Sequence, residues 1–344
     1  MTDSTAGTAG CIRTFSPAND KVFIVAEIGA NHHQMFANAE ALVIAAKQAG
    51  ADAVKIQIFR PEDMTINSGS HVIKDGPWAG STLWDLYSKA CFPTIWLGRL
   101  KDIAKKMGII LFPTVYSKWG LEVAERYEFP IYKISSFELN HLDLINEVAK
   151  TKKPIIVSAG MADYNEIDKA IRTVKKHHNN IAILRCVSEY PAPIENMNLV
   201  TMCAYERCFK VSAGLSDHTT GITCPVVAVA LGAKVIEKHI TLDNSGLDGE
   251  FSITPDRFDV MVKAIRMAEM SIGRITYGGQ KKFRRATVAI KEIKQGDALD
   301  NSNTNILRVV DNVGVSELKI ADKDYVEGNI INGRREGTKI TVST

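Results

Sequence analysis

Two histidines are the residues of this chain with the clearest capacity for chemistry. His218 ends the phrase Leu215-Ser216-Asp217-His218, and His239 ends the phrase Glu237-Lys238-His239, each directly after an apolar stretch. Neutral imidazoles beside carboxylates are groups that a divalent metal ion prefers. If the two phrases close neighbouring strands of a barrel, both imidazoles reach one rim, and His218 and His239 are predicted to be metal ligands.

Two lysines inside apolar runs, Lys55 and Lys133, predict an anion site. Burying a lysine in an apolar strand is costly unless it meets an anion. Hydroxyl residues end the neighbouring strands and can add donors to a phosphate or carboxylate; they are Thr114, Ser136, Ser158, Ser188 and Ser216. Two alternatives stay open. The lysines can form internal salt bridges to Glu27 or Glu237, or one of them can form a Schiff base as in class I aldolases.

The elements that must position these groups are eight short apolar runs that alternate with helix-like segments. The runs cover residues 22–28, 53–59, 109–115, 131–135, 155–158, 181–187, 211–215 and 235–240. Near-continuous apolar strands indicate a parallel sheet buried on both faces. Eight such units predict an α/β fold of the (β/α)8 TIM-barrel type rather than an open doubly wound sheet, with the active site at the carboxyl ends of the strands.

The domain organisation follows from changes in composition along the chain. Residues 1–20 are polar and predict a loose N-terminal arm, and residues 21–272 form the barrel. Residues 273–285 are rich in Gly, Lys and Arg and predict a linker, and residues 286–344 predict a small β-rich domain with strand-like runs at 287–290, 306–310 and 339–342. The segment 61–93, which contains Trp78, is longer than a usual βα loop and is either functional or a surface excursion.

Composition excludes several classes. The net charge of +3 over 344 residues argues against a dedicated nucleic-acid binder. No apolar run reaches membrane-spanning length, so no membrane partner is expected. The six cysteines lack metal-binding spacing and predict reduced thiols in a cytoplasmic protein.

The strand-end phrases resemble those of the sialic acid synthase family, in family order over nearly the whole chain. They are Glu27-Ile28-Gly29-Ala30-Asn31-His32, Val54-Lys55-Ile56-Gln57, Tyr132-Lys133-Ile134-Ser135-Ser136-Phe137-Glu138, Pro154-Ile155-Ile156-Val157-Ser158-Ala159-Gly160-Met161, Tyr190-Pro191-Ala192-Pro193 and the two histidine phrases. The last domain resembles the antifreeze-like (SAF) domain of these enzymes. The phrases Lys74-Asp75-Gly76-Pro77-Trp78 and Glu250-Phe251-Ser252 look most like the pseudaminic acid synthase branch.

The resemblance implies a transferase that condenses phosphoenolpyruvate with an N-acylated amino sugar, giving a nonulosonic acid and phosphate with Mn²⁺, or Mg²⁺ or Co²⁺, as cofactor. For the pseudaminic branch the sugar is 2,4-diacetamido-2,4,6-trideoxy-altrose; N-acetylneuraminate and legionaminate synthases are alternatives. The metal ligands are then His218 and His239. The implied phosphoenolpyruvate contacts are Lys55, Thr114, Lys133, Ser136, Ser158, Ser188 and Ser216. The implied sugar contacts are Gln57, Trp78, Tyr190, Glu237, Asp248 and Arg308. Glu27 and Glu138 are the proton-transfer candidates beside the catalytic lysines Lys55 and Lys133.

The sequence departs from the family pattern at three places, of which the last concerns the sugar. His33-Gln34 replaces the usual Gly after the Asn-His pair, and Ser188 stands where an Asn is common. The Arg-Pro-Gly phrase of the SAF domain is absent. Either Arg308, two positions early, substitutes for its arginine or that contact is lost. The family also implies a homodimer with exchanged SAF domains. A catalytically lapsed sugar-binding protein is the alternative of another class.

Overall fold

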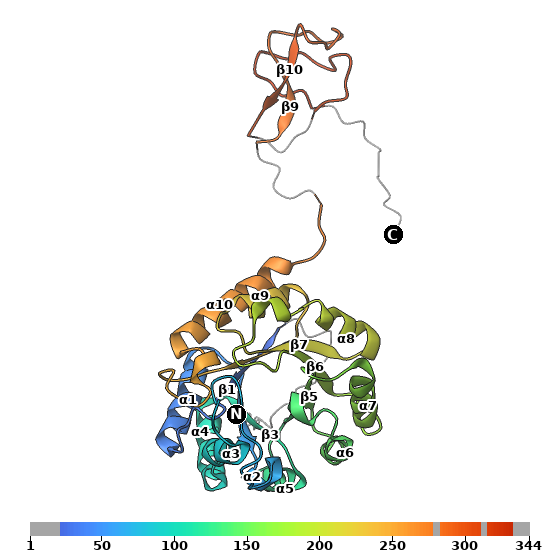
Figure 1. Cartoon of the computed structure of the whole chain (residues 1–344). Helices are drawn as coiled ribbons and strands as arrows, with labels where there is room; N and C mark the ends of the chain where they lie inside the picture. Colours follow the sequence, from blue (N-terminus) through green and yellow to red (C-terminus); the bar gives the residue numbers. More distant parts are fainter. Residues whose placement is uncertain (1–20, 278–282, 311–314, 333–344) are drawn as a thin grey trace, which may run out of the picture. The chain divides into compact units, whose positions relative to one another are not determined.

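Eight parallel strands close into a barrel in the first of the two units into which the chain divides, residues 1–273 and 274–344 (Figure 1). The computed structural model describes residues 21–277, 283–310 and 315–332. The strands are β1 (Phe23–Glu27), β2 (Ala53–Ile58), β3 (Ile110–Val115), β4 (Tyr132–Ile134), β5 (Ile155–Ser158), β6 (Ile181–Cys186), β7 (Ser212–Asp217) and β8 (Val235–His239). β8 returns to β1 with Glu27 paired to His239, which confirms the predicted (β/α)8 barrel.

Helices surround the barrel strands (Figure 1). They are α1 (Phe36–Gln48), α4 (Leu97–Met107), α5 (Lys118–Arg126), α6 (Leu142–Lys150), α7 (Tyr164–Lys175), α8 (Thr201–Phe209), α9 (Thr223–Ala230) and α10 (Pro255–Ile272). The long segment after β2 contains two further helices, α2 (Pro61–Met64) and α3 (Leu83–Ala90). Short 3₁₀ turns follow several strands, among them η2 (Ser136–Glu138) after β4 and η4 (Gly249–Phe251) after β8.

Two apolar clusters fill the two sides of the strands. Because side chains alternate along a strand, every second residue faces the barrel axis and the others face the helices. The inward cluster includes Phe23, Val25, Phe112, Ile156 and Leu184. These residues lie toward the amino ends of their strands, so the barrel has an apolar floor and leaves the polar inward residues at the carboxyl ends.

The second unit contains an antiparallel pair, β9 (Arg285–Ala289) and β10 (Thr304–Arg308). A small core of Ala289, Ile293, Ala321, Tyr325 and Ile331 supports it. A small C-terminal β domain is therefore present, as predicted. The predicted arm at residues 1–20, part of the predicted linker at 278–282 and the predicted run at 339–342 lie outside the described residues.

Two other findings concern the described part of the chain. None of its helices combines the length and the apolar character that crossing a bilayer requires. Its cysteines, Cys91, Cys186, Cys203, Cys208 and Cys224, are all free thiols, while Cys11 lies outside the described residues.

Candidate active site

Two connected cavities occupy the carboxyl end of the barrel. The inner chamber, about 70 Å³, is lined mainly by inward strand residues: Lys55, Lys133, Ser158, Cys186, Ser216, Glu237 and His239 among them. The outer chamber, about 140 Å³, is lined mainly by residues of the loops that follow the strands. Gln57, Tyr116, Phe137, Tyr190 and His239 line both, so one chamber leads into the other.

Two lysines and two glutamates form a buried charge network at the base of the inner chamber. Lys55 Nζ lies 2.6 Å from Glu27 Oε2 and 3.6 Å from Glu237 Oε1. Lys133 Nζ lies 3.7 Å from the same Glu237 oxygen. All four side chains are buried. The internal ion pairs that were one alternative for the lysines are present. Both lysines also line a cavity, and the anion site stays a prediction.

Burial and the charges of the network shift the pKa values of Glu237, Lys55 and Lys133. Burial would raise the pKa of Glu237, but the charges of Lys133 and Lys55 hold it well below its usual range. Burial alone would lower the pKa of Lys55, but Glu237 and Glu27 raise it above the ordinary value. For Lys133, burial prevails and lowers the pKa. Lys133 is thus the less compensated cation, and an added anion would stabilise its charged form.

Hydroxyl groups complete the inner chamber. Lys133 Nζ donates to Ser158 Oγ at 2.7 Å, and Lys55 Nζ donates to Thr114 Oγ1 at 2.8 Å. Ser136 and Ser188 share a hydrogen bond of 2.6 Å. Gly160 lies against this pair, since a Cβ there would come within 2.4 Å of Ser188 Oγ. The missing side chain at Gly160 lets two hydroxyls from different strands converge on one place.

The two histidines meet at the boundary of the chambers, with ring centroids 5.5 Å apart. His218 Nδ1 lies 2.9 Å from the Val187 carbonyl, which can only accept, so Nδ1 carries the proton and Nε2 keeps its lone pair. Burial, followed by the neighbouring His239, lowers the pKa of His218 to about 3, so the ring is neutral. Neutral imidazoles with available lone pairs fit a divalent ion.

His218 and His239 would be the protein's contribution to such a site. Within residues 21–277, 283–310 and 315–332 there is no cluster of three or more His, Cys, Asp or Glu side chains that could hold an ion. An ion held by His218 and His239 would therefore take its other ligands from water or from a substrate. This is an arrangement that allows a substrate oxygen to reach the ion.

Asp248 stands behind His239. Its Oδ2 accepts a hydrogen bond from the Ala30 amide at 2.9 Å and lies 3.5 Å from His239 Nδ1, which is buried and has no hydrogen-bond partner of its own among the described residues. Burial would raise the pKa of Asp248, but His239 and the Ala30 amide hold it below its usual range. A carboxylate in this position orients a metal-ligating imidazole. Asp248 also lines the outer chamber, so it can contact a sugar as well.

A second buried ion pair fixes the strands that carry the histidines. Lys238 Nζ lies 2.7 Å from Asp217 Oδ2, and both side chains are fully buried on the helix side of the sheet. Asp217 pairs with Lys238 in the register of β7 and β8. Asp217 and Lys238 directly precede His218 and His239 in the chain. The ion pair therefore holds together the strand ends from which the two imidazole rings project.

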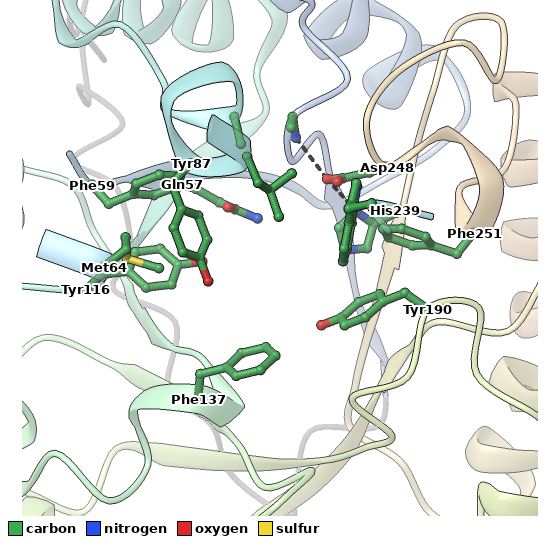
Figure 2. A pocket seen from close by; sticks show the side chains of 14 residues that line it. Gln57, Phe59, Met64, Tyr87, Tyr116, Phe137, Tyr190, His239, Asp248 and Phe251 are labelled. Carbon is green, nitrogen blue, oxygen red and sulfur yellow. Dashed lines mark hydrogen bonds and ion pairs between the residues drawn. The ribbon is translucent and has the colours of Figure 1, made fainter. Parts of the chain in front are cut away.

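Figure 2 shows the outer chamber between two walls. On one side lie Phe59, Met64, Tyr87 and Tyr116, and on the other lie Tyr190, His239, Asp248 and Phe251. Trp78, in the long segment 61–93, lines this chamber and anchors the segment there. Its Nε1 donates a hydrogen bond to the Leu247 carbonyl at 2.8 Å, and its ring centroid lies 5.5 Å from that of Tyr190. The long segment is therefore part of the site rather than a surface excursion.

Glu27 and Glu138 differ in their surroundings. Glu27 is paired with Lys55 and also accepts a hydrogen bond from Gln57 at 2.8 Å. Glu138 lies beside Ser135, whose hydroxyl donates to it, and burial raises its pKa to about 7. A carboxyl group with this pKa can give and take a proton at neutral pH.

The structure brings most of the predicted residues to the chambers. Those that line a chamber are Lys55, Gln57, Trp78, Lys133, Ser136, Ser158, Tyr190, Ser216, His218, Glu237, His239 and Asp248. Three more lie directly behind the lining residues, because each forms a hydrogen bond with one of them; they are Glu27, Thr114 and Ser188. Glu138 follows Phe137 at the edge of the inner chamber. Arg308 is an exposed residue of β10 in the second unit, and its sugar contact stays a prediction.

The prediction missed the apolar part of the site, namely Phe59, Met64, Leu86 and Phe251, and also missed Cys186. Cys186 could have been found, because it lies two residues before Ser188 at the end of an apolar run and so points inward. Phe59 directly follows β2 in the same way. Met64 and Leu86 carried no such signal, since their helices belong to a long segment without a strand period.

A barrel rim that joins buried lysines, hydroxyls and two histidines defines a class of protein, a (β/α)8 enzyme that handles an anionic substrate. Within that class the chain belongs to the NeuB family, whose model matches residues 42–277. The predicted family is thereby confirmed.

Individual relatives agree with this membership. The chain is 40% identical over 297 residues to pseudaminic acid synthase of Helicobacter pylori, covering 83% of this chain and 87% of that protein. It is 33% identical over 334 residues to N,N'-diacetyllegionaminic acid synthase of Campylobacter jejuni, covering 90% and 99%. The crystal structure of N-acetylneuraminic acid synthetase from Leptospira borgpetersenii matches with a TM-score of 0.69 and 29% identity, covering 76% of this chain and 88% of that one.

Proposed function

We propose that this chain condenses phosphoenolpyruvate with an open-chain N-acylated amino sugar to give a nonulosonic acid and phosphate, and that the sugar is the 2,4-diacetamido-2,4,6-trideoxy-altrose of pseudaminic acid. The observation that carries the proposal is the junction of the two chambers. A lysine- and serine-lined chamber suited to a small polyanion opens beside His218 and His239 into a larger chamber suited to a sugar. The 40% identity to a pseudaminic acid synthase supports the choice of sugar.

In the proposed reaction the inner chamber holds phosphoenolpyruvate. Lys133 and Lys55 would contact its phosphate and carboxylate, with the hydroxyls of Ser136, Ser158 and Ser216 as further donors. The methylene carbon would then face the outer chamber. The lysines also stabilise the negative charge of the departing phosphate, since they are fixed in a buried site before reaction.

His218 and His239 would hold a divalent ion, which when bound polarises the sugar aldehyde as a Lewis acid. The new carbon–carbon bond forms between the methylene carbon and the aldehyde carbon, and the aldehyde oxygen takes up a proton. Water then adds to the former enol carbon and phosphate leaves. One proton is therefore delivered and another removed, and a group with a pKa near 7 suits both tasks.

Glu138 is our candidate for that group, because its pKa is raised to about 7 and it carries no ion pair among the described residues. Glu27 is held by Lys55 and serves as its charge partner. A raised pKa keeps the acid form present up to about neutral pH, so a reaction that starts with Glu138 protonated loses rate as the pH rises through 7.

Replacing Glu138 with Gln is expected to lower the rate of phosphate release by about 100-fold and to remove the decline of kcat above pH 7. Initial rates from pH 5.5 to 9 at saturating substrates measure both effects. Glu147→Gln, on the surface of α6, is the matched control and should keep the wild-type profile. An unchanged decline above pH 7 in the Glu138→Gln enzyme would assign the proton transfer elsewhere.

The test of the function is a phosphate-release assay with phosphoenolpyruvate, Mn²⁺ and each of three sugars: the diacetamido-trideoxy-altrose, its legionaminic counterpart and N-acetylmannosamine. We expect turnover with all components present and none when any is omitted, with the altrose derivative preferred. Preference for another sugar would point to a legionaminate or neuraminate synthase. Sugar binding without phosphate release under all conditions would favour a catalytically lapsed protein.

A Schiff-base aldolase is a second candidate, favoured by the lowered pKa of the buried Lys133. Borohydride treatment in the presence of pyruvate separates the two. A trapped adduct on Lys133, with activity resistant to EDTA, would support the aldolase. The condensation proposed here predicts no adduct.

The native metal, the homodimer with exchanged C-terminal domains, the assignment of that domain as an SAF domain and the role of Arg308 belong to the same proposal. Light scattering of the active enzyme tests the dimer, and a fully active monomer would exclude it.

A further inference from the structure

We propose that the wall of the outer chamber formed by Phe59, Met64 and Leu86 selects a sugar that ends in a methyl group, and discriminates against the same sugar with a terminal hydroxymethyl group. These residues are called the methyl wall below. The inference rests on the proposed condensation and names the part of the substrate that decides its selection.

The first step is the direction in which the sugar must lie. The aldehyde has to meet the methylene carbon of phosphoenolpyruvate where the two chambers join, beside His239 and Tyr190. The far end of the sugar then extends into the outer chamber, toward the residues that do not also line the inner one. Figure 2 shows Phe59 and Met64 across the chamber from His239 and Asp248.

The second step is the chemistry of that far side. Among the outer-chamber residues, Asp248 is the only carboxylate, and it lies on the His239 side. The methyl wall offers a phenyl ring, a thioether and an isobutyl group, and Ala90 adds a methyl group beside them. The three wall side chains themselves offer a hydroxyl no hydrogen-bond partner, whereas a methyl group placed against them would bury apolar surface. The polar groups on this side of the chamber belong to Gln57, Tyr87 and Tyr116.

The third step is the rigidity of the wall. α3, which carries Leu86, is held at its end by Gln34, whose Nε2 donates to the carbonyls of Lys89 at 2.8 Å and Cys91 at 2.6 Å. Phe59 is buried and packs edge-on against Tyr87 and Tyr116 at 5.7 and 5.2 Å. Phe59 and the helix that carries Leu86 are therefore both held in place by neighbouring side chains.

The unusual His33-Gln34 pair has a structural role, because the Gln34 side chain holds the end of α3. Both residues have positive φ values, 51° and 55°, which non-glycine residues adopt at a cost. The glycine expected from the family pattern would accept this backbone more easily, but it has no side chain to hold α3. The departure in sequence therefore contributes the clamp on the methyl wall.

The experiment compares kcat/KM for the diacetamido 6-deoxy sugar and for its 6-hydroxy counterpart in three proteins. The wild type should prefer the 6-deoxy sugar by about 10- to 100-fold, the range within which an apolar pocket discriminates against an added hydroxyl. Met64→Gln, which keeps the side-chain length and adds an amide, should reduce that preference at least about 5-fold. Met267→Gln, on the exposed face of α10, is the matched control and should keep the wild-type preference.

Leu86→Asn is the second variant, for use if Met64→Gln does not fold, and the same reduction is expected. No preference in the wild type, or a preference unchanged in both folded variants, would overturn the inference. Absence of phosphate release with either sugar would instead overturn the proposed function. In that case, binding of the two sugars, measured by isothermal titration calorimetry, tests the wall alone. A methyl preference that Met64→Gln reduces supports the wall, and equal binding overturns it.

Discussion

Lys133→Met is expected to lower the rate of phosphate release by about 1,000-fold, the loss that follows when a fixed charge is removed from a buried site where negative charge develops. The substitution keeps the length of the side chain and removes only its charge. Lys55 still compensates Glu237 in the variant, so the barrel should keep its fold. Initial rates and the affinity for phosphoenolpyruvate, measured by calorimetry, report the effect, and thermal unfolding reports the fold.

Lys169→Met is the control for this variant, because Lys169 is an exposed residue of α7. It should leave rate and affinity unchanged. A folded Lys133→Met enzyme that retains more than half of the wild-type rate would place the anion site elsewhere. Loss of activity with unchanged phosphoenolpyruvate affinity would restrict Lys133 to the chemical step.

Removal of divalent ions with EDTA is expected to reduce phosphate release at least about 100-fold, and added Mn²⁺ should restore it. His218→Ala should weaken Mn²⁺ binding well below that of the wild type, because it removes one of the two imidazoles available to the ion. Electron paramagnetic resonance of bound Mn²⁺ measures this binding without any substrate turnover. Isolated binding should be weak even in the wild type, since the described residues provide only two such ligands at this place.

His141→Ala, an exposed position before α6, is the control and should bind Mn²⁺ like the wild type. EDTA-resistant activity would contradict the metal assignment. Equal Mn²⁺ stoichiometry in the His218→Ala protein would contradict the choice of ligand.

The barrel and its polar rim could be predicted because both depend on local, periodic signals. Eight apolar runs give the strands, and alternation along each run decides that Lys55 and Lys133 face inward. The end of β7 was harder to predict. The strand continues through Asp217, beyond the predicted 211–215, because Asp217 pairs with Lys238 and buries its charge against it. In the sequence, Asp217 looks like a residue beyond the end of a strand, because the lysine that compensates its charge becomes its neighbour only in the folded sheet.

Other parts of the site depend on distant contacts and could not be predicted. Met64 and Leu86 reach the outer chamber only because Gln34 and Leu247 hold the long segment from other loops. The difference between Glu27 and Glu138 is also tertiary. Both are glutamates near strand ends, and only the ion pair of one and the burial of the other separate their chemistry.

The charge network of the inner chamber has a consequence for the selectivity of the barrel. Its two lysines and two glutamates carry equal and opposite formal charges, and Lys133 is the less compensated of the two cations. Each lysine already contacts a carboxylate, so an anion that binds here must compete with that carboxylate and partly displace it. Binding is thus an ion exchange, in which Glu237 acts as an internal competitor. Chloride and other singly charged ions gain little from that exchange, whereas a molecule with both a phosphate and a carboxylate engages two lysines at once.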